Sequence, residues 1–432
     1  MLPVLLMEPN INNTRRGFSN TLLGLKEANR LNLDEIKIRL REIRNYSIAY
    51  KDSLIEELTT SLAANPEVEM TFAKDGRQAI EAIKEIGNGS PIAINKSAIV
   101  TRELMPILID SGFNVIETYF DQFEPFESKF DRPWRLPRME CESLLETFDQ
   151  SKNLMALREA SVRQHGSKDF IGLLGVNAVS AKDGEILLLQ HMHNISDVFK
   201  QAKKLILIVS LNKIVKDLDE AVFQTKCMAV FGSGALPLSL HGKNGNGDNI
   251  DNLPFKIPPD QTEKKLHIIL FDNGRSDILS SRHKDLLACI DCRACTKGCP
   301  AFPFFEEEAP WSPKEYLYFY VTGKIPSLDL CLQCKSCQVN CPLSIDLPGM
   351  ILDDRVDAMA KKRHSFADIL LSNFETLARW GSSMPTFISV AANSRLVRWL
   401  GEKMLGISKE RQFPEYQSKT FTKWFRSSSE KK

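Results

Sequence analysis

The chain has 432 residues, of which 43% are hydrophobic and 26% are charged, and this balance is that of a folded globular protein. A formal net charge of +1 gives no global basic field that would attract nucleic acid. The length indicates two or three domains. Of the ten cysteines, eight lie between Cys289 and Cys341, which a secreted disulfide framework explains poorly in a chain of this length.

No targeting segment or membrane span is apparent in the sequence. The apolar run Met1–Met7 is too short for a secretory core and has no cationic region before it, so it predicts a first strand or a loose end. No stretch approaches the ~20 apolar residues that cross a bilayer. We therefore expect a cytoplasmic protein, in which thiols stay reduced and available as metal ligands, and we leave open a peripheral attachment to the inner face of the membrane.

The first two thirds of the chain alternates helices with short apolar strands. Residues 8–30 are polar and broken by Pro and Gly, and we expect the whole segment 1–32 to be poorly ordered. Helical spacing of apolar residues predicts helices at Leu33–Leu62, Asp75–Ile86, Thr101–Ser111 and Leu144–Gln164. Apolar runs predict strands at Pro91–Ile94, Asn114–Tyr119, Phe170–Val179, Glu185–Gln190, Leu205–Ser210 and Leu266–Phe271. This alternation predicts an α/β domain with a largely parallel sheet at residues 33–280.

Two copies of one cysteine motif follow, each of the form C-x₂-C-x₂-C-x₃-C-P. The first copy consists of Cys289, Cys292, Cys295, Cys299 and Pro300, and the second of Cys331, Cys334, Cys337, Cys341 and Pro342. At this spacing three thiolates wrap one face of a [4Fe–4S] cluster, and the fourth cysteine ligates the other cluster. We therefore expect two clusters, one held by Cys289, Cys292, Cys295 and Cys341 and the other by Cys331, Cys334, Cys337 and Cys299. Cys141 and Cys227 are expected not to be ligands.

A pair of zinc ribbons is the alternative explanation, because zinc sites also use C-x₂-C. Zinc needs four ligands in two pairs. It calls neither for a third cysteine at the same interval nor for a repeated Cys-Pro. Two copies of the full pattern in one chain therefore favour two [4Fe–4S] clusters over zinc.

The sequence around the motifs predicts a mostly α-helical dicluster ferredoxin domain at residues 281–362. Ser312 and Glu315 form a capping box with Pro313 at the first helical position, and Gly323 ends that helix. A further helix is predicted directly after the second motif. The cluster pair would then lie between helices.

Residues 363–432 form a basic tail with two predicted amphipathic helices, Phe366–Trp380 and Leu396–Leu405. From Arg395 to Lys432 there are ten Lys and Arg against four Asp and Glu, which leaves a charge of +6. Two interpretations stay open. The helices pack on the ferredoxin domain with a basic solvent face, or they form a docking arm for an acidic partner subunit or an anionic membrane surface.

Three segments resemble the lactate-utilisation iron–sulfur proteins, which join an LUD domain to a bacterial-type dicluster ferredoxin domain. Leu266–Leu279 (LHIILFDNGRSDIL), followed ten residues later by Cys289, is similar to their domain junction. Asn95–Leu104 (NKSAIVTREL) resembles their Lys-Ser-x-x-Val-Thr-x-Glu segment, and Ala202–Ala221 resembles their central strand with the loop after it. The resemblance covers the chain from about residue 35 to about residue 350.

The resemblance implies an α/β domain of the sugar-isomerase and CoA-transferase type, and a role in quinone- or carrier-linked oxidation of lactate or another 2-hydroxy acid. It also implies partner subunits, commonly one with cysteine-rich CCG domains, or a flavin or LUD subunit. The run Lys403–Phe425 is similar to the segment that precedes CCG domains in heterodisulfide-reductase-like subunits. An electron-transfer subunit of such a complex is therefore an alternative.

Outside the cysteines the candidate site residues are less specific. Four polar residues follow predicted strands, where α/β folds bind ligands: Lys96, Ser97, Thr101 and Lys213. Arg275 either holds a carboxylate ligand by bidentate hydrogen bonds or braces the domain junction, and the sequence favours neither. His191 and His193 fit a solvated loop better than a metal site, because no third ligand is obvious nearby.

The leading hypothesis is an electron-transfer subunit of a multi-subunit oxidoreductase. One alternative is an enzyme whose LUD domain itself binds and oxidises the hydroxy acid, and another is a redox or iron sensor. No Gly-x-Gly-x-x-Gly follows a strand and opens a helix, so no dinucleotide site is apparent. The sequence identifies no set of His, Asp and Arg that would form a catalytic site.

Overall fold

The computed structural model describes residues 4–9, 33–117 apart from 88 and 96, 170–189, 195, 198–199, 202–233, 255–256, 264–305, 311–361 and 366–429 apart from 414. By its internal contacts the chain divides into two compact units, Met1–Ile351 and Leu352–Lys432. This division does not delimit the four predicted domains, so their boundaries stay predictions. The predicted helix Leu144–Gln164 lies outside the described residues.

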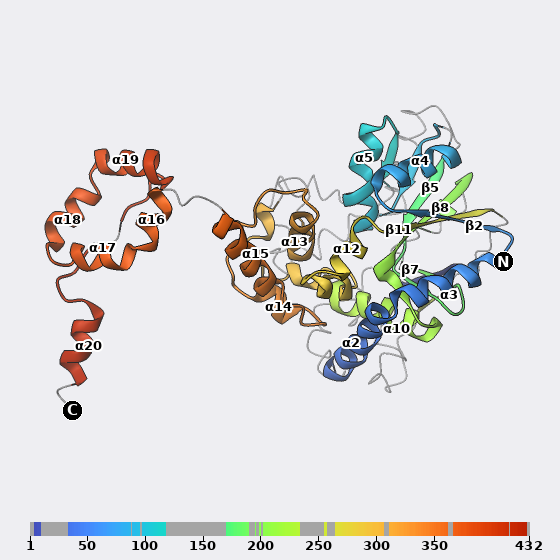
Figure 1. The fold of residues 1–432 in the computed structure, drawn as a ribbon, viewed down its shortest axis with the longest axis horizontal. Helices are drawn as coiled ribbons and strands as arrows, with labels where there is room; N and C mark the ends of the chain where they lie inside the picture. Colours follow the sequence, from blue (N-terminus) through green and yellow to red (C-terminus); the bar gives the residue numbers. More distant parts are fainter. Residues whose placement is uncertain are drawn as a thin grey trace, which may run out of the picture. The chain divides into compact units, whose positions relative to one another are not determined.

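The first unit is built on a parallel sheet, seen edge-on in the right half of Figure 1. Among the described residues its strand order is β2 (Val68–Ala73), β11 (Leu266–Phe271), β8 (Lys204–Ser210), β5 (Ile171–Gly175), β3 (Ile92–Ile94) and β4 (Val115–Glu117). Each neighbouring pair is parallel. Their carboxyl ends therefore share one edge of the sheet, and this confirms the predicted α/β fold.

A second, mixed sheet lies in the same unit. Its order among the described residues is β10 (Phe255–Lys256), β1 (Val4–Pro9), β7 (Ile186–Leu189), β6 (Ala178–Ser180) and β9 (Ile214–Val215). Strand β1 runs parallel to β7 and antiparallel to β10, so the first apolar run of the chain is a strand. Residues 10–32 lie outside the described part, and their predicted disorder stays a prediction.

Helices cover both faces of the parallel sheet, and β8 shows how the sequence arranges this. Leu205, Leu207 and Val209 pack in one core with the apolar face of α3 (Lys51–Ala63). Ile206 and Ile208 face the opposite core, with α4 (Gly76–Gly87), the π-helix η2 (Ile99–Leu104) and α5 (Met105–Asp110). Successive strand residues point to opposite faces, so a continuously apolar strand is buried on both sides.

The cysteine-rich region joins the α/β part through a third core. This core contains α2 (Leu33–Ala49), α10 (Leu218–Met228), the 3₁₀ turn η7 (Lys284–Ala288), α13 (Pro313–Val321) and α15 (Leu347–Lys361). Leu40, Phe223, Leu286, Leu317 and Ile351 are all buried in it. Helix α12 (Arg275–Leu279) leads from β11 into this region, beside which α13, α14 (Ser336–Asn340) and α15 are drawn in Figure 1.

The capping box predicted for α13 is confirmed. The hydroxyl of Ser312 accepts from Glu315 N at 3.2 Å, and the Glu315 carboxylate accepts from Ser312 N at 2.6 Å. Pro313 is the first residue of the helix, and Gly323 follows its end with φ +73°. These contacts fix the start of the helix that carries Lys314 and Tyr318.

The second unit contains short helices: α16 (Phe366–Ser372), α17 (Phe374–Gly381), α18 (Pro385–Ala392), α19 (Arg395–Leu405) and α20 (Phe421–Ser429). Apolar side chains of this unit are largely exposed, among them Trp380 at 72%, Phe387 at 69% and Phe421 at 75%. None of the helices in the described part of the chain is long and apolar enough to cross a membrane.

Four elements differ from their prediction. Leu33–Leu62 is two helices, α2 and α3, with Tyr50 between them. Phe170–Val179 is two strands, because the chain leaves one sheet at Gly175 and enters the other at Ala178. Thr101–Ser111 splits into η2 and α5, since Pro106 has no N–H to continue the helical ladder. Phe366–Trp380 breaks at Asn373, whose side-chain amide donates to Ile369 O at 2.8 Å. The edge strand β2 was not predicted from its partly exposed sequence.

The central strand should dominate the stability of the first unit. Leu207→Ala removes a fully buried side chain between covered faces and should lower the free energy of unfolding by about 2–5 kcal/mol. Ile109→Ala, at a position 55% exposed, is the matched control and should change it little. Urea unfolding followed by far-UV circular dichroism measures both. Equal midpoints for the two variants would contradict this packing.

Candidate metal centre

The two cysteine loops share one backbone shape. The motifs are 42 residues apart. At equivalent positions both loops enter the left-handed region of backbone conformation. The first loop does so at Asp291 (φ +61°) and Arg293 (φ +60°), and the second at Gln333 (φ +55°) and Lys335 (φ +61°). Non-glycine residues rarely adopt this conformation, which turns successive N–H groups toward one concave side. In the first loop the N–H of Asp291 donates to Cys289 Sγ at 3.3 Å. The duplicated sequence therefore gives a duplicated anion-binding loop.

The thiols fall into two neighbourhoods that cross between the motifs. Burial is the largest cause that raises the pKa of Cys292 to about 11, and the neighbouring sulfur of Cys341 contributes to the rise. The pKa of Cys295 is also raised, by burial first and then by neighbouring Cys292 and Cys341. The last cysteine of the second motif thus lies beside the first motif.

The converse holds for the second loop. Burial raises the pKa of Cys337 to about 12, with Cys299, Cys331 and Cys334 as its neighbouring thiols. Cys299, the last cysteine of the first motif, likewise has Cys334 and Cys331 as neighbours. Burial favours the protonated thiol, whereas a coordinating metal ion deprotonates it.

The thiol donors suit iron–sulfur clusters, but they do not surround a site for a single metal ion. No group of three or more His, Cys, Asp or Glu residues within the described ranges has the geometry of a metal-ion site. A [4Fe–4S] cluster is larger than a single ion and holds four thiolates around a cubane. The motif spacing, with three cysteines at equal intervals and a fourth before proline, fits a cluster better than a zinc ion.

The first loop is held by a charge cluster in which the partly buried carboxylate of Asp291 pairs with two buried lysines. The carboxylate lies 2.6 Å from Lys213 Nζ and 3.0 Å from Lys314 Nζ. Burial by itself raises the pKa of Asp291, but the two ammonium groups outweigh it and hold the pKa well below its usual range. Lys213 also donates to Ile290 O at 2.9 Å. Lys213 follows β8, so a residue at the carboxyl edge of the sheet contacts the loop directly.

A second buried pair braces the junction next to this cluster. Arg275 donates to both carboxylate oxygens of Glu103, at 2.7 and 3.1 Å, and its Nε donates to Asn212 Oδ1 at 3.1 Å. Tyr318 of α13 donates to Glu103 at 3.1 Å. Arg275 thus has its carboxylate within the chain, and the structure decides for the bracing role. The side-chain amide of Asn212 reaches on to Cys289 O at 3.3 Å.

Arg44 of α2 ties a third element to the loop. Its guanidinium is buried and donates to Leu287 O at 3.0 Å, Ala288 O at 3.2 Å and Asn212 O at 2.6 Å. Burial lowers the pKa of Arg44 to about 10. The carbonyls of Leu287 and Ala288 end the η7 turn just before Cys289, where a cation is favourable.

The π-helix η5 (Ala229–Ser233) packs against the same loop. A Cβ added at Gly232 would collide with the carbonyl oxygen of Cys292. Close by, Lys297 Nζ donates to Phe231 O at 2.7 Å. Only a residue without a side chain lets these two backbones approach so closely.

The other predicted site residues fall into four groups. Lys213 reaches the first cysteine loop, and Arg275 pairs with Glu103 beside it. Ser97 and Thr101 do not, and Thr101 Oγ1 donates to Ser97 O at 3.0 Å inside the α/β part. Cys227 is buried in the third core. The remaining four lie outside the described residues: Lys96, Cys141, His191 and His193.

Sequence reasoning missed four residues of this site: Arg44, Glu103, Asp291 and Lys314. Asp291 offered a signal, since a carboxylate between two cluster cysteines needs a counter-charge. Lys314 offered none beyond its place in a capping box. Glu103 and Arg44 are distant in sequence and meet the loop only through packing.

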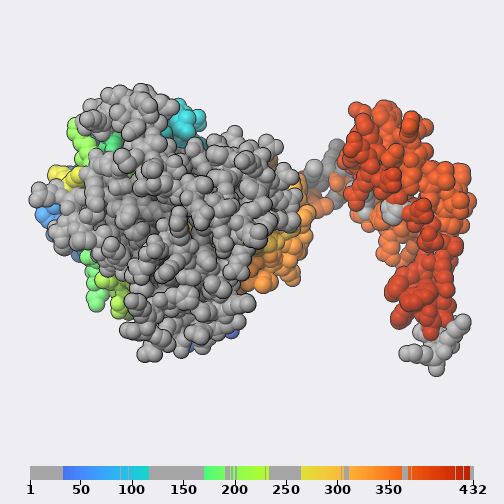
Figure 2. Space-filling view, turned by 180° about the vertical axis from the view of Figure 1, so that it is seen from behind, coloured from blue at the N-terminus to red at the C-terminus, as the bar shows by residue number. Residues whose placement is uncertain are grey.

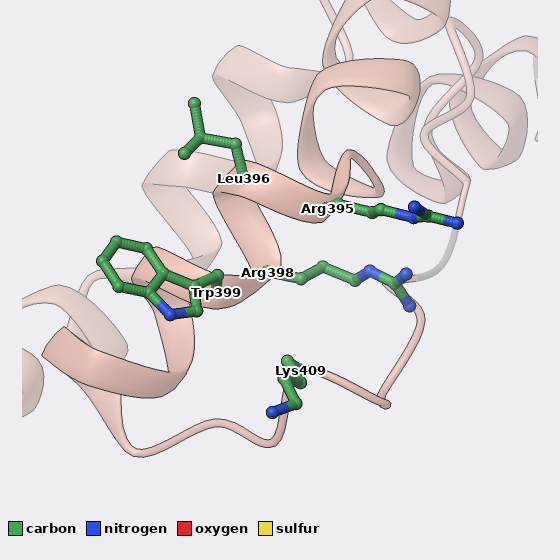
Figure 3. A pocket seen from close by; sticks show the side chains of 5 residues that line it. All are labelled: Arg395, Leu396, Arg398, Trp399 and Lys409. Atoms are coloured by element: carbon green, nitrogen blue, oxygen red, sulfur yellow. The ribbon is translucent and has the colours of Figure 1, made fainter.

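The second unit has a pocket of about 500 Å³ lined by Arg395, Leu396, Arg398, Trp399 and Lys409. Figure 3 shows Arg395 and Arg398 running side by side, with their guanidinium groups directed away from the Lys409 ammonium group. Lys409 is instead 3.6 Å from Glu402. The three cations therefore do not converge on one point.

Fold and site together define a class of protein, an iron–sulfur electron-transfer protein. It has two cysteine loops, and its α/β domain binds the first of them. The family comparisons agree, since the LUD domain matches residues 55–270 and the 4Fe-4S dicluster domain matches residues 288–346. The chain belongs to the LUD domain family.

Curated relatives match most of the chain at low identity. Lactate utilization protein B 1 of Bacillus mycoides is 24% identical over 91% of this chain and 87% of its own length. The uncharacterized electron transport protein YkgF of Escherichia coli is 26% identical over 76% of this chain and 72% of its own. Lactate utilization protein B of Geobacillus kaustophilus is 23% identical over 95% and 91%. No solved structure gives a significant match.

Removing the Glu103 carboxylate should destabilise the protein, because it leaves the buried guanidinium of Arg275 without its counter-charge. Glu103→Gln should lower the free energy of unfolding by about 3–5 kcal/mol at pH 7. Burial raises the pKa of Glu103, but Arg275 and Asn273 leave it below the ordinary value of 4.5. A depressed pKa means that this stability is present above the ordinary value and is lost as the pH falls through the native one. Urea midpoints for wild type and variant should therefore differ by a constant amount from pH 8 to pH 5.5.

Glu81→Gln, at an exposed position of α4, is the control and should match wild type. A difference in urea midpoint between wild type and Glu103→Gln that narrows steadily from pH 8 to pH 5.5 would contradict the depressed pKa of Glu103. A gap no larger than that of the control would contradict the pairing itself.

Gly232→Ala should disturb the first cysteine loop selectively. The new methyl group meets backbone at Cys292, which cannot swing aside as a side chain can. We expect the purified variant to lose about half its iron, because one of two clusters is affected. Gly401→Ala, with nothing within 4 Å of the added Cβ, should keep all of it. Iron analysis after anaerobic purification decides, and full iron in Gly232→Ala would contradict the close approach.

Proposed function

We propose that this chain is an electron-transfer subunit that holds two [4Fe–4S] clusters. One observation carries the proposal. Two cysteine motifs with the same spacing have loops of the same backbone shape, with thiols gathered in two sets. Such clusters supply one-electron transfer when bound, and their potentials depend on nearby charge and hydrogen bonds.

The proposed ligation crosses between the motifs. Cys289, Cys292, Cys295 and Cys341 would hold the first cluster, and Cys331, Cys334, Cys337 and Cys299 the second. The thiol neighbourhoods support this division, because Cys341 affects Cys292 and Cys295 whereas Cys299 affects Cys337. Lys213, Lys314 and the loop N–H groups would be the chain's means of offsetting negative charge at the first cluster.

The substrate proposal comes from the relatives. Two of them are named lactate utilization proteins, and a third is named an electron transport protein. We infer that this chain accepts electrons derived from lactate or another 2-hydroxy acid. Oxidising such an acid removes two electrons as a hydride or its equivalent, a step that usually needs a flavin or nicotinamide. A partner subunit would therefore carry the oxidation.

The rival function is an LUD domain that oxidises the acid itself. Parallel α/β sheets bind ligands outside the carboxyl ends of their strands. Here Asn212 and Lys213, which follow β8, and Arg275, which follows β11, are bonded to the cysteine loop and to Glu103. The two cations, Lys213 and Arg275, are not free to hold a substrate carboxylate, which favours the electron-transfer role.

The cluster content follows from the two motifs. Protein purified without oxygen should hold about eight iron and eight sulfide per chain. Cys341→Ser should perturb the cluster of the first motif and Cys299→Ser that of the second, as read by the electron paramagnetic resonance of the reduced protein. Cys227→Ser should leave the iron unchanged. Iron near four, stoichiometric zinc, or each motif depending on its own fourth cysteine would contradict the proposal.

The isolated chain should not oxidise lactate. Protein with both clusters intact would be mixed with L- or D-lactate and a dye acceptor. We expect reduction of the dye by dithionite-reduced protein but no sustained turnover of either acid. Steady turnover without an added subunit or flavin would replace the electron-transfer proposal with a catalytic LUD domain.

A further inference from the structure

The two cysteine loops are alike in backbone but opposite in exposure. Ala288 and Ile290 flank Cys289 in the first loop and are 8% and 1% exposed. Their equivalents in the second loop, Leu330 and Leu332, are 44% and 67% exposed. The second loop thus presents larger apolar side chains to solvent at the positions that the first loop buries.

What covers the first loop is the edge of the α/β sheet and the elements next to it. Arg44 binds the carbonyl of Ala288, Asn212 that of Cys289, and Lys213 that of Ile290. The covering surface therefore combines apolar contact with side-chain donors to main-chain carbonyls. Among the described residues of the α/β part no element buries Leu332 in this way, as its exposure shows.

On the far side of the loop the two motifs differ in contact, although both side chains are exposed. Lys297 in the first motif donates to Phe231 of the π-helix, whereas its equivalent Val339 is 80% exposed. Between Leu332 and Val339 lies Cys334, an exposed cysteine of the second set. Atoms of this part of the chain, drawn in orange, lie on the surface in Figure 2. A proposed cluster ligand is thus bordered in sequence by exposed apolar side chains.

We propose that the second cysteine loop is the docking surface for a redox protein, which covers Leu330, Leu332 and Val339 as the α/β edge covers the first loop. The proposal rests on the cluster-binding function above. One electron passes between the cluster at Cys334 and the partner's flavin, haem or iron–sulfur group, one of which is oxidised as the other is reduced, with no bond made or broken. Charged residues are depleted from the centres of such interfaces, as they are at these three positions.

The test places a photoreactive p-benzoylphenylalanine at position 332, and separately at 339, of the full chain in its native host. Position 109 on α5, also an exposed apolar site, is the control. We expect an adduct from 332 and 339, but not 109, with one protein that carries a redox cofactor. That protein, once purified, should oxidise the dithionite-reduced chain.

A matched pair of substitutions measures the contact. Leu332→Glu should slow that electron transfer at least about tenfold, because it places a carboxylate without a partner in an apolar contact. Ile109→Glu should change the rate of electron transfer less than about twofold, well below the tenfold change expected for Leu332→Glu. Iron content and reducibility are determined first for every variant.

Absence of clusters from the wild-type chain would contradict the proposed function itself. With clusters present, three results would overturn the docking surface alone. These are no adduct at 332 and 339, an adduct only with residues 352–432 or with a second copy of this chain, and equal rates for Leu332→Glu and Ile109→Glu.

Discussion

The structure depends on one carboxylate, that of the partly buried Asp291, held between the buried ammonium groups of Lys213 and Lys314. The three groups come from the cysteine loop, from the turn after a central strand of the sheet, and from the first turn of α13. A buried charge is tolerated only when it is paired and hydrogen-bonded, so these contacts require each other. Since Asp291 stands between Cys289 and Cys292, the pairing fixes the place of the loop on the sheet.

The consequence is that an α/β fold uses its usual ligand-binding edge for another purpose. Asn212, Lys213 and Arg275 are directed at the chain's own cysteine loop and at Glu103. The α/β part and the first loop share one core through Leu40, Phe223 and Leu286. In the proposed function the domain holds the loop of the first cluster, and the second loop is the exposed member of the pair.

Much of the site could be predicted from local sequence. The cysteine spacing specifies both loops, and the capping box at Ser312 specifies the start of α13, because both patterns act within a few residues. The parallel sheet also followed from apolar runs such as Leu205–Ser210. What failed were local interruptions, at Pro106 and Asn373, where one residue divides a continuous apolar pattern.

Long-range pairing could not be predicted. Lys213 meets the carbonyl of Ile290 across 77 residues, and Arg275 meets Glu103 across 172. Arg275 was equally consistent with a ligand or a brace, since the sequence does not say which carboxylate it faces. The relation between the two loops was likewise hidden, because equal spacing gives no sign that one loop is covered and the other exposed.

The most direct test compares two lysines of one loop. Lys213 is 7% exposed and binds Asp291, whereas Lys216 is 53% exposed and lies 3.8 Å from Asp217. Iron and sulfide would be counted in anaerobically purified Lys213→Met and Lys216→Met. The account predicts that Lys213→Met retains about half the iron of wild type, because the first of two clusters is lost, and that Lys216→Met retains all of it. Full iron content in Lys213→Met would contradict it.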